Sequence, residues 1–473
     1  MKVRTRFAPS PTGYMHIGNL RTAIYEYSVA RKYKGDFILR IEDTDQERKV
    51  DGAVDFIYNT LSLCGFKIDE GPNNEGNYGP YVQSERKDIY KKYAEELVEK
   101  GVAYYCFCTE EELDKMRELA NARKVPFLYN GKCSHLTKEE IEENLKAGKP
   151  YVIRQKMPKE GQTIVEDVVY GKIKIDNSVL EDQILLKSDG FPTYNFANVI
   201  DDHLMEITHV IRGKEYLDQT AKYNLLYDAF GWEKPTYIHV AMVLGEDGNK
   251  LSKRNGDASF MDLYEDGYLP EAIVNYLTLL GWSPADNNEV FTLEELAEKF
   301  DETRISKSSS QYDVKKLDWF NSQYIKNMDD EKYLAWIKPF LTHDTSSKDE
   351  EWVNKLLLTY KSHISKGKDI NDEVKNFFAD EYNLSDECKE FLASDEVIPT
   401  VISTFADELE AITDWNTDNI NAAIENVKNK CNVKGKLLYM PLRIKASGYM
   451  HGPELDACIY LLGKDKSLNN LRK

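Results

Sequence analysis

The sequence contains only seven cysteines among its 473 residues, an odd and sparse number that does not fit a disulfide framework. It also lacks any run of the ~18–20 apolar residues that a membrane-spanning helix needs. The N-terminal residues include Lys2, Arg4 and Arg6, but no apolar segment or small-residue cleavage site of a signal peptide follows them. These absences predict a reduced protein of the cytoplasm with no membrane partner.

Glycine and proline are not abundant either, with 26 and 15 residues, while 41% of the residues are hydrophobic and 30% are charged. This composition excludes collagen-like, low-complexity and wholly disordered chains. At roughly 150 residues per domain, the length suggests about three domains. A chain of this size can bury several cores without covalent cross-links.

Basic residues are fewer than acidic ones: the sequence has 62 Lys and Arg and 81 Asp and Glu, which gives a net charge of −19. The imbalance is regional. Residues 1–40 hold eight basic and two acidic residues, residues 428–473 hold ten and three, and residues 328–427 hold nine and 23. The acidic total predicts weak non-specific binding to nucleic acid, while the two basic regions leave room for a specific, salt-sensitive contact with a polyanion.

The first part of the chain alternates strand and helix. Residues 3–7 form a strand-like run, a turn cluster follows at 9–13, and apolar residues from 17 to 30 recur at helical spacing before a second strand at 37–41. This pattern predicts a doubly wound parallel sheet, with later strands at 206–211 and 236–243. Residues 104–184 are expected to be an inserted, mostly β-rich module flanked by helical arms, and helices are expected after about residue 260.

Two stretches have the composition of a phosphate-binding site. Residues 7–19 follow a strand and open a helix, so free backbone N–H groups point toward a possible phosphate. His16 can donate to a phosphate oxygen, and Gly18, which has no side chain, lets an adenine ring pack against the backbone. Residues 250–256 place Lys250 and Lys253 around a serine, and two such cations stabilise the charge that develops on a departing pyrophosphate. Taken singly, the first is also compatible with an ordinary turn carrying a surface histidine, and the second with a solvated basic loop.

In this order and on such a sheet, the two stretches resemble the signature motifs of the class I aminoacyl-tRNA synthetases. The first matches the His-x-Gly-His pattern with Asn19 in the last position, and the second is close to Lys-Met-Ser-Lys-Ser. Longer segments resemble the bacterial glutamyl-tRNA synthetase family over essentially the whole chain. These segments are 6–13, 40–45, 186–194, 198–203, 441–443 and 462–464.

The resemblance implies a fold and a division into domains. The fold is α/β: a Rossmann-type doubly wound parallel sheet with an inserted acceptor-binding α+β module, followed by all-α anticodon-binding domains. The catalytic domain would comprise 1–88 and 191–243, the inserted acceptor-stem module 89–190, a helical stem-contact domain with the lysine loop 244–325, and the anticodon-binding region 326–473.

The resemblance also implies an activity, that of a glutamate–tRNA ligase acting in translation. Such an enzyme activates L-glutamate with ATP and Mg²⁺ to glutamyl-adenylate, and transfers the glutamyl group to the 3′ end of tRNA(Glu), releasing AMP and pyrophosphate. We expect a monomer whose partners are ATP, glutamate and tRNA.

Residue roles follow from the matched motifs. The residues expected around glutamate are Arg6, Ser10, Glu42, Tyr194, Asn198 and Arg212, with Ser10 and Glu42 near the ammonium group. The residues expected around ATP are His16, Gly18, Glu215, Tyr216, Val243, Lys250 and Lys253, of which His16, Lys250 and Lys253 are catalytic. Arg212 is expected to separate glutamate from glutamine, since an Arg fork matches a carboxylate and a neutral amide leaves it uncompensated; without the family match, Arg212 would be read as a structural ion pair. Lys214 and Tyr216 depart from the family pattern.

The cysteine pattern predicts a metal site. Cys106 and Cys108 precede Cys133 and His135, and these four residue types form a tetrahedral set for one structural Zn²⁺. The alternative is a group of buried thiols beside a polar histidine. In the resembled family, the same module carries zinc in some bacterial members.

Other functions remain to be compared with this one. A nucleotidylyltransferase shares the His-x-Gly motif but is much shorter, and a truncated tRNA-modifying glutamyl transferase ends near the catalytic domain. A catalytically inactive RNA-binding protein would lack His16 or Lys253, and glutaminyl-tRNA synthetases end in β-barrels. In the resembled family, members that charge only tRNA(Glu) read the last anticodon base with an arginine of the helical domain. The stretch 360–372, where that arginine is expected, contains lysines and His363 but no arginine. Whether tRNA(Gln) is charged as well therefore stays open.

Overall fold

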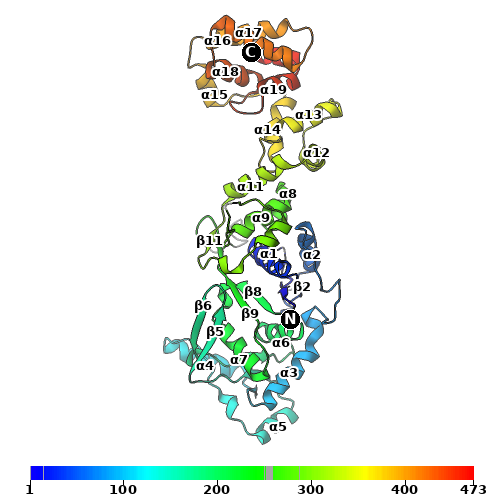
Figure 1. The fold of residues 1–473 in the computed structure, drawn as a ribbon. Coiled ribbons are helices and arrows are strands. Elements are labelled where there is room, and N and C mark those ends of the chain that lie inside the picture. Colours follow the sequence, from blue (N-terminus) through cyan, green and yellow to red (C-terminus); the bar gives the residue numbers. More distant parts are fainter. Residues whose placement is uncertain (1, 14, 49, 250, 252–258, 287) are drawn as a thin grey trace. The chain divides into compact units, whose positions relative to one another are not determined.

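The strand–helix–strand pattern at the start of the sequence is present in the computed structural model, which describes all residues except 1, 14, 49, 250, 252–258 and 287. Strand β1 (Arg4–Phe7) leads into helix α1 (Ile17–Lys32), and strand β2 (Asp36–Leu39) returns parallel to β1 (Figure 1). The apolar residues at helical spacing are buried, among them Leu20, Ile24 and Ala30 at 0% exposure. A Cβ atom at Gly35 would lie 2.1 Å from the Val3 carbonyl oxygen, so the turn between α1 and β2 requires glycine.

The chain divides into two compact units. The first consists of Met1–Asp262 and Ile273–Asp313, and the second of Leu263–Ala272 and Val314–Lys473. The expected α/β fold followed by an all-α region is confirmed.

In the first unit the sheet continues through strands from later in the chain. Strand β8 (His209–Gly213) pairs in parallel with β9 (Thr236–Val240), and the N–H of Thr208 donates to the Arg4 carbonyl over 3.0 Å at the edge of β1. Strand β9 also pairs in parallel with β5 (Gln162–Asp167), which forms an antiparallel hairpin with β6 (Gly171–Asp176). The order β6-β5-β9-β8 shows that part of the inserted module extends the catalytic sheet.

The rest of the inserted module is a three-stranded antiparallel sheet with helical arms, as expected. Its strands are β3 (Ala103–Cys106), β4 (Val152–Gln155) and β7 (Ile184–Leu186). Helix α2 (Ala53–Leu63) precedes the module, and the helical arms are α3 (Lys87–Glu99), α4 (Glu110–Ala122) and α5 (Lys138–Lys146). The short helical turns are η1 (Gln83–Arg86), η2 (Lys132–His135) and η3 (Asn177–Val179).

Two helices and a short turn flank strand β8 in the sequence, and further elements follow β9. The two helices are α6 (Tyr194–Leu204) and α7 (Thr220–Phe230), and the turn η4 (Lys214–Tyr216) directly follows β8. The expected strand 236–243 is divided into β9 and β10 (Val243–Leu244), and β10 pairs with β11 (Ser310–Gln311). The remaining elements before residue 313 are α8 (Phe260–Asp266), α9 (Pro270–Leu279), α10 (Leu293–Lys299) and η6 (Glu302–Arg304).

The second unit is helical around one hydrophobic core. Leu356, Val401, Phe405 and Leu442 are fully buried members of this core. The helices after residue 313 are α11 (Val314–Asn327), α12 (Asp330–Ile337), α13 (Glu350–Tyr360), α14 (Asp369–Phe378), α15 (Asp386–Leu392), α16 (Ile398–Glu410), α17 (Thr417–Cys431), α18 (Lys436–Ser447), α19 (Leu455–Leu462) and α20 (Lys464–Arg472), with the turn η7 (Lys338–Phe340) after α12.

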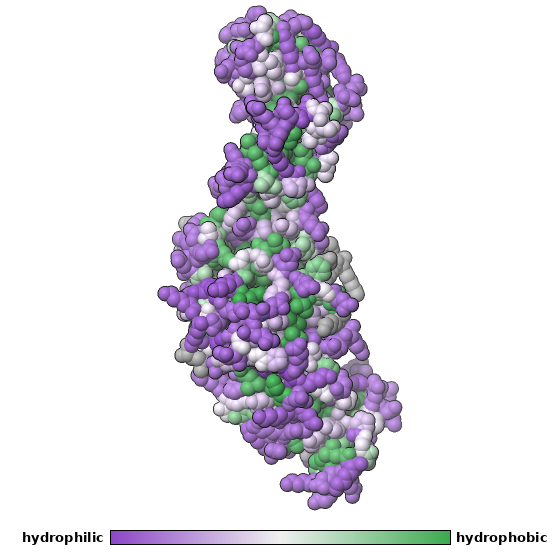
Figure 2. Space-filling model, turned by 90° about the vertical axis from the view of Figure 1, so that its right-hand side faces the viewer, coloured by the Kyte–Doolittle hydropathy of each residue, from purple (hydrophilic) through white to green (hydrophobic). Residues whose placement is uncertain are grey.

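Among the described residues, no helix is both long and apolar enough to cross a membrane. The face of the molecule in Figure 2 is largely hydrophilic, with hydrophobic residues in separate patches between purple ones.

Candidate active site

A cavity of about 740 Å³ opens in the first unit at the carboxyl ends of parallel strands, the usual place for a ligand in such sheets. It is built from the turn after β1, the start of α1, the residues after β2, the start of α6, and the turn after β8. Ten of the residues expected at the site line it: Arg6, Ser10, His16, Gly18, Glu42, Tyr194, Arg212, Glu215, Tyr216 and Val243. The structure therefore brings together residues that lie more than 200 positions apart in the sequence.

Three expected residues are not in this lining. Asn198 lies on α6 with 1% exposure, and its buried Nδ2 makes no hydrogen bond. Lys250 and Lys253 lie outside the described residues, although Leu251 between them does line the cavity.

His16 occupies the N-cap position of α1. Its Nδ1 accepts a hydrogen bond from the N–H of Gly18 over 3.1 Å. A neutral ring with an acceptor at Nδ1 carries its proton on Nε2, so this cap presents a donor at the positive end of the helix. A donor and a helix N-terminus together suit a phosphate group.

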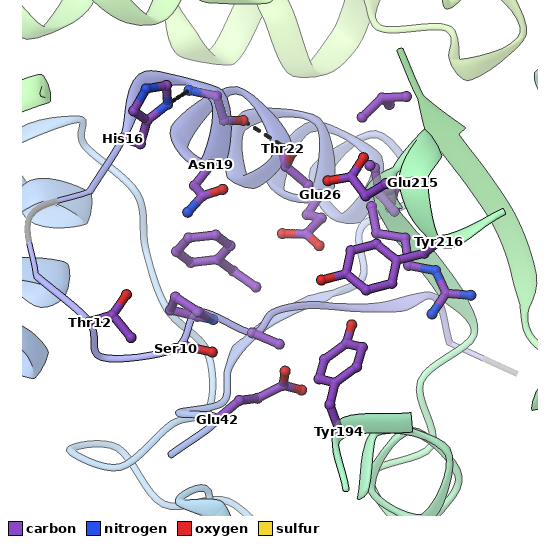
Figure 3. A pocket seen from close by; sticks show the side chains of 18 of the residues that line it. Ser10, Thr12, His16, Asn19, Thr22, Glu26, Glu42, Tyr194, Glu215 and Tyr216 are labelled. Atoms are coloured by element: carbon purple, nitrogen blue, oxygen red, sulfur yellow. Dashed lines mark hydrogen bonds between the residues drawn. The ribbon is translucent and has the colours of Figure 1, made fainter. Parts of the chain in front are cut away.

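Several polar side chains converge on the interior of the cavity. In Figure 3 the carboxylates of Glu26 and Glu42 and the hydroxyls of Tyr194 and Tyr216 point toward one another from different elements. Burial raises the pKa of Glu42, although neighbouring Arg40 and Arg6 act in the opposite direction. Two carboxylates and two phenols on one interior surface can hold an ammonium group.

Arg6 is not a free cation in this arrangement. Its Nε donates to Asp202 over 3.0 Å, and its guanidinium also contacts Glu26 over 3.3 Å. Arg40 donates to the same Asp202 oxygen over 2.7 Å and to Glu42 over 2.9 Å. All these side chains are almost fully buried, so the charges of Arg6 and Arg40 are compensated from within the protein.

Arg212 is held differently, by neutral groups. Its Nε donates to Nε2 of His239 over 3.1 Å, and its NH2 group donates to the Thr220 hydroxyl over 2.8 Å. The guanidinium also lies 4.6 Å from the ring centroid of Tyr223. No carboxylate forms an ion pair with Arg212 within the part of the chain that the structure describes. Its charge is therefore available to a ligand in the cavity.

Three residues of this site were not predicted from the sequence: Glu26, Asp202 and His239. Glu26 lines the cavity from α1, and one of its oxygens is buried without a partner. Burial raises the pKa of Glu26 well above its usual value. The available signal was an acidic residue on a helix whose neighbouring residues are apolar, whereas nothing local distinguished Asp202 or His239.

A second cluster lies in the inserted module, where the Sγ atoms of Cys106, Cys108 and Cys133 are all within 4.8 Å of one another. The hydroxyl of Tyr129 joins them, 3.4 Å from the Cys106 sulfur and 3.3 Å from the Cys108 sulfur. His135 has an exposed side chain and does not belong to this group of ligand atoms. Three sulfurs at this spacing can supply three ligands of a tetrahedral Zn²⁺, and the Tyr129 hydroxyl lies within 3.4 Å of two of them.

Comparison with known proteins gives consistent matches along the chain. Residues 2–319 match the family described as tRNA synthetases class I (E and Q), catalytic domain, and residues 332–473 match the anticodon binding domain family. The chain is 50% identical to the glutamate–tRNA ligases of Clostridium botulinum strain Eklund 17B and Clostridium tetani, and covers 98% and 97% of their lengths. In both cases the match spans 100% of this chain.

Solved structures give the same result. The glutamate tRNA ligase of Elizabethkingia meningosepticum, in complex with its amino acid, is 35% identical with a TM-score of 0.89. The match covers 100% of this chain and 99% of that one. The synthetase of Elizabethkingia anophelis is similar at a TM-score of 0.90, 35% identity and the same coverage.

Proposed function

This chain belongs to the glutamate and glutamine group of the class I tRNA synthetases and has the activity of a glutamate–tRNA ligase, and we propose how its own residues carry out that activity. The cavity of the first unit is the site of amino-acid activation. Because an anticodon binding domain follows the catalytic domain, a truncated tRNA-modifying transferase does not fit the chain.

Arg212 supplies the observation that carries the assignment of the amino acid. A buried cation whose described partners are all neutral binds a carboxylate more strongly than an amide, because the amide is uncharged and has only one acceptor oxygen. The side-chain carboxylate of glutamate would bind to Arg212, with Tyr194 beside it. Asn198, buried on α6 outside the cavity lining, would support this pocket. Glu42 and Ser10 would hold the ammonium group. Arg6, fixed by Asp202 and Glu26, would orient the substrate without being its main charge partner.

The ATP would lie at the start of α1, with His16 and Gly18 along the phosphates and Glu215, Tyr216 and Val243 near the nucleoside. The α-carboxylate of glutamate attacks the α-phosphorus, and pyrophosphate leaves. His16, Lys250 and Lys253 stabilise the charge that develops in line with the attack. When Mg²⁺ is bound with ATP, it would add to this charge stabilisation.

The second step uses tRNA as the nucleophile. A hydroxyl of the terminal adenosine attacks the glutamyl carbonyl carbon, the bond to the phosphate breaks, and AMP leaves. No side chain of the protein forms a covalent intermediate. We assign the acceptor stem to the inserted module (89–190), further stem contacts to 244–325, and the anticodon of tRNA(Glu) to 326–473, with 1–88 and 191–243 as the catalytic domain.

We also propose one structural Zn²⁺ held by Cys106, Cys108 and Cys133. The hydroxyl of Tyr129 is the fourth donor supported by the distances, in place of the expected His135. The ion would tie the residues after β3 to η2 and so fix the fold of the inserted module. We place the enzyme in the cytoplasm, where translation occurs, acting as a monomer.

Aminoacylation with labelled glutamate and purified tRNA(Glu) tests the proposed function. We expect ATP-dependent transfer of glutamate to the tRNA, and none with glutamine. Charging with glutamine in preference to glutamate contradicts the assignment of Arg212.

A further inference from the structure

We propose that His239, fixed by Asp167, is a positioning residue for Arg212 and a determinant of glutamate over glutamine, because it holds the guanidinium without neutralising its charge. This inference rests on the proposed function of the cavity. It concerns two residues behind the cavity wall rather than the residues that touch the substrate.

The three side chains come from three neighbouring strands. Strand order β5-β9-β8 places Asp167 at the end of β5, His239 on β9 and Arg212 on β8. Arg212 and His239 are direct partners in the parallel register, so their side chains leave the sheet on the same face. The sheet itself therefore determines the row Asp167–His239–Arg212.

Asp167 is held as an acceptor on both oxygens. One oxygen accepts the N–H groups of Val169 and Tyr170 over 2.9 and 2.8 Å. The other accepts the backbone N–H of His239 over 3.0 Å and lies 2.7 Å from its Nδ1. Four such contacts leave the carboxylate no freedom to turn, and an acceptor at this place requires a proton on Nδ1 of His239.

The other nitrogen of the imidazole must then be an acceptor. Nε2 of His239 lies 3.1 Å from the Nε donor of Arg212 and 3.3 Å from the Thr220 hydroxyl. Burial lowers the pKa of His239. The charged and titratable groups that face this ring are Asp167 from β5, Arg212 from β8, Glu215 from η4 and, 6.2 Å away between ring centroids, Tyr237 from β9. A second ring proton would put two N–H donors face to face, so the neutral ring is the form that fits Arg212.

A neutral acceptor has a different consequence from a carboxylate. The nearby Arg6 shows the contrast, because its Nε donates directly to the carboxylate of Asp202. At Arg212, the carboxylate of Asp167 contacts the imidazole of His239 and not the guanidinium itself. The guanidinium is thereby oriented by a fixed hydrogen bond and keeps its charge for the substrate carboxylate, which glutamine does not have.

The experiment compares glutamate and glutamine as substrates of ATP–pyrophosphate exchange in the full-length enzyme with tRNA present, reading KM and kcat separately. The variants are H239E, which replaces the neutral acceptor with a carboxylate, H239Q, which keeps a neutral acceptor, and D167N, which replaces one acceptor oxygen of Asp167 with an NH2 donor and removes its charge. D182N is the matched control. Asp182 is also a buried carboxylate, which accepts the N–H of Met157 over 3.1 Å and the Tyr104 hydroxyl over 2.7 Å, but it has no contact with Arg212.

We expect H239E and D167N to raise the glutamate KM at least about tenfold, the scale of a lost hydrogen bond to a charged group. The KM for ATP should be unchanged, H239Q should retain most of the preference for glutamate, and D182N should retain all of it. The inference is overturned if folded H239E and D167N keep the wild-type preference. Wild-type enzyme that activates no glutamate would instead refute the proposed function, so the two failures are distinguishable.

A measurement on the wild-type protein covers the case in which these variants do not fold. Selective ¹⁵N labelling of histidine, with the His239 ring signal assigned in the wild-type protein by its correlation with the backbone, reports which ring nitrogen carries the proton. We expect a neutral ring protonated on Nδ1 near pH 7. An imidazolium, or a neutral ring protonated on Nε2, overturns the inference.

Discussion

The Nε of Arg6 donates to a carboxylate oxygen of Asp202 over 3.0 Å, and Arg40 donates to the same oxygen over 2.7 Å. Asp202 therefore ties two buried arginines together beneath the cavity. The coulombic attraction of these arginines lowers the pKa of Asp202 although burial raises it. This shared carboxylate holds the end of β1 against α6, and with it the wall of the site.

Asp202→Asn should be strongly destabilising, because it leaves two buried cations short of a counter-charge. We expect a loss of about 3–5 kcal/mol in the free energy of unfolding, measured by urea unfolding. Glu142→Gln serves as a control, since it removes one partner of the exposed Lys146–Glu142 pair, and should cost less than about 1 kcal/mol. Equal effects of the two substitutions would contradict the role of Asp202.

Arg212→Cys should abolish glutamate activation, because it removes a buried cation whose hydrogen-bond partners, His239 and Thr220, are neutral. ATP–pyrophosphate exchange with tRNA present measures this. ATP binding, followed separately by protection against proteolysis, should be retained, since Arg212 is not among the residues expected at ATP. Undiminished exchange with glutamate would exclude Arg212 as the specificity residue.

Lys253→Ala, in the segment outside the described residues, should lower the rate of exchange by a factor of about 10²–10³, the usual effect of removing one group that stabilises transition-state charge. The loss should be in kcat rather than in the KM for glutamate. Lys146→Ala, at an exposed site on α5, is the control and should behave as wild type. Exchange at the wild-type rate in Lys253→Ala would contradict the catalytic assignment.

Glu26→Gln should change how stability depends on pH. Because burial raises the folded-state pKa of Glu26, the folded protein binds a proton that the unfolded chain, with an ordinary Glu pKa of about 4.3, releases. The contribution of Glu26 to stability is therefore present at low pH and is lost as the pH rises through the raised value. Unfolding midpoints at acidic and alkaline pH should show wild type losing stability relative to Glu26→Gln as the pH rises. Parallel pH profiles would show that Glu26 ionises normally.

Elemental analysis should find about one zinc per chain in the purified protein. Cys133→Ser should lose the metal. Tyr129→Phe should weaken binding, and His135→Ala should leave it unchanged, because His135 lies outside the cluster. If Tyr129→Phe retains zinc and His135→Ala loses it, the fourth ligand is His135, as expected from the sequence.

Part of this structure was predictable because it depends on local patterns. The periodicity of residues 17–30 predicted α1 and its buried face, and the turn before it predicted a helix N-terminus with His16 at the site. The inserted module was predicted as separate from the sheet, but β5 pairs with β9 through Asp167 and Tyr237. That pairing joins positions 70 residues apart, and no local pattern encodes it.

The same distinction applies to the site. Motif residues were predicted individually, and ten of them line one cavity. Asp202 and His239 were missed because their importance comes only from the strands and helices that bring them to Arg6 and Arg212. The proximity of Tyr129 to the cysteines was not predicted for another reason, because a tyrosine in such a stretch is normally a core residue and does not match the spacing of cysteine and histidine ligands.

We propose that this cavity activates glutamate and rejects glutamine through Arg212. The most direct test is the initial rate of ATP–pyrophosphate exchange by the wild-type enzyme with tRNA(Glu), measured with glutamate and with glutamine. The account predicts tRNA-dependent exchange with glutamate and none above background with glutamine. Equal rates with the two amino acids, or exchange with glutamine alone, would contradict it.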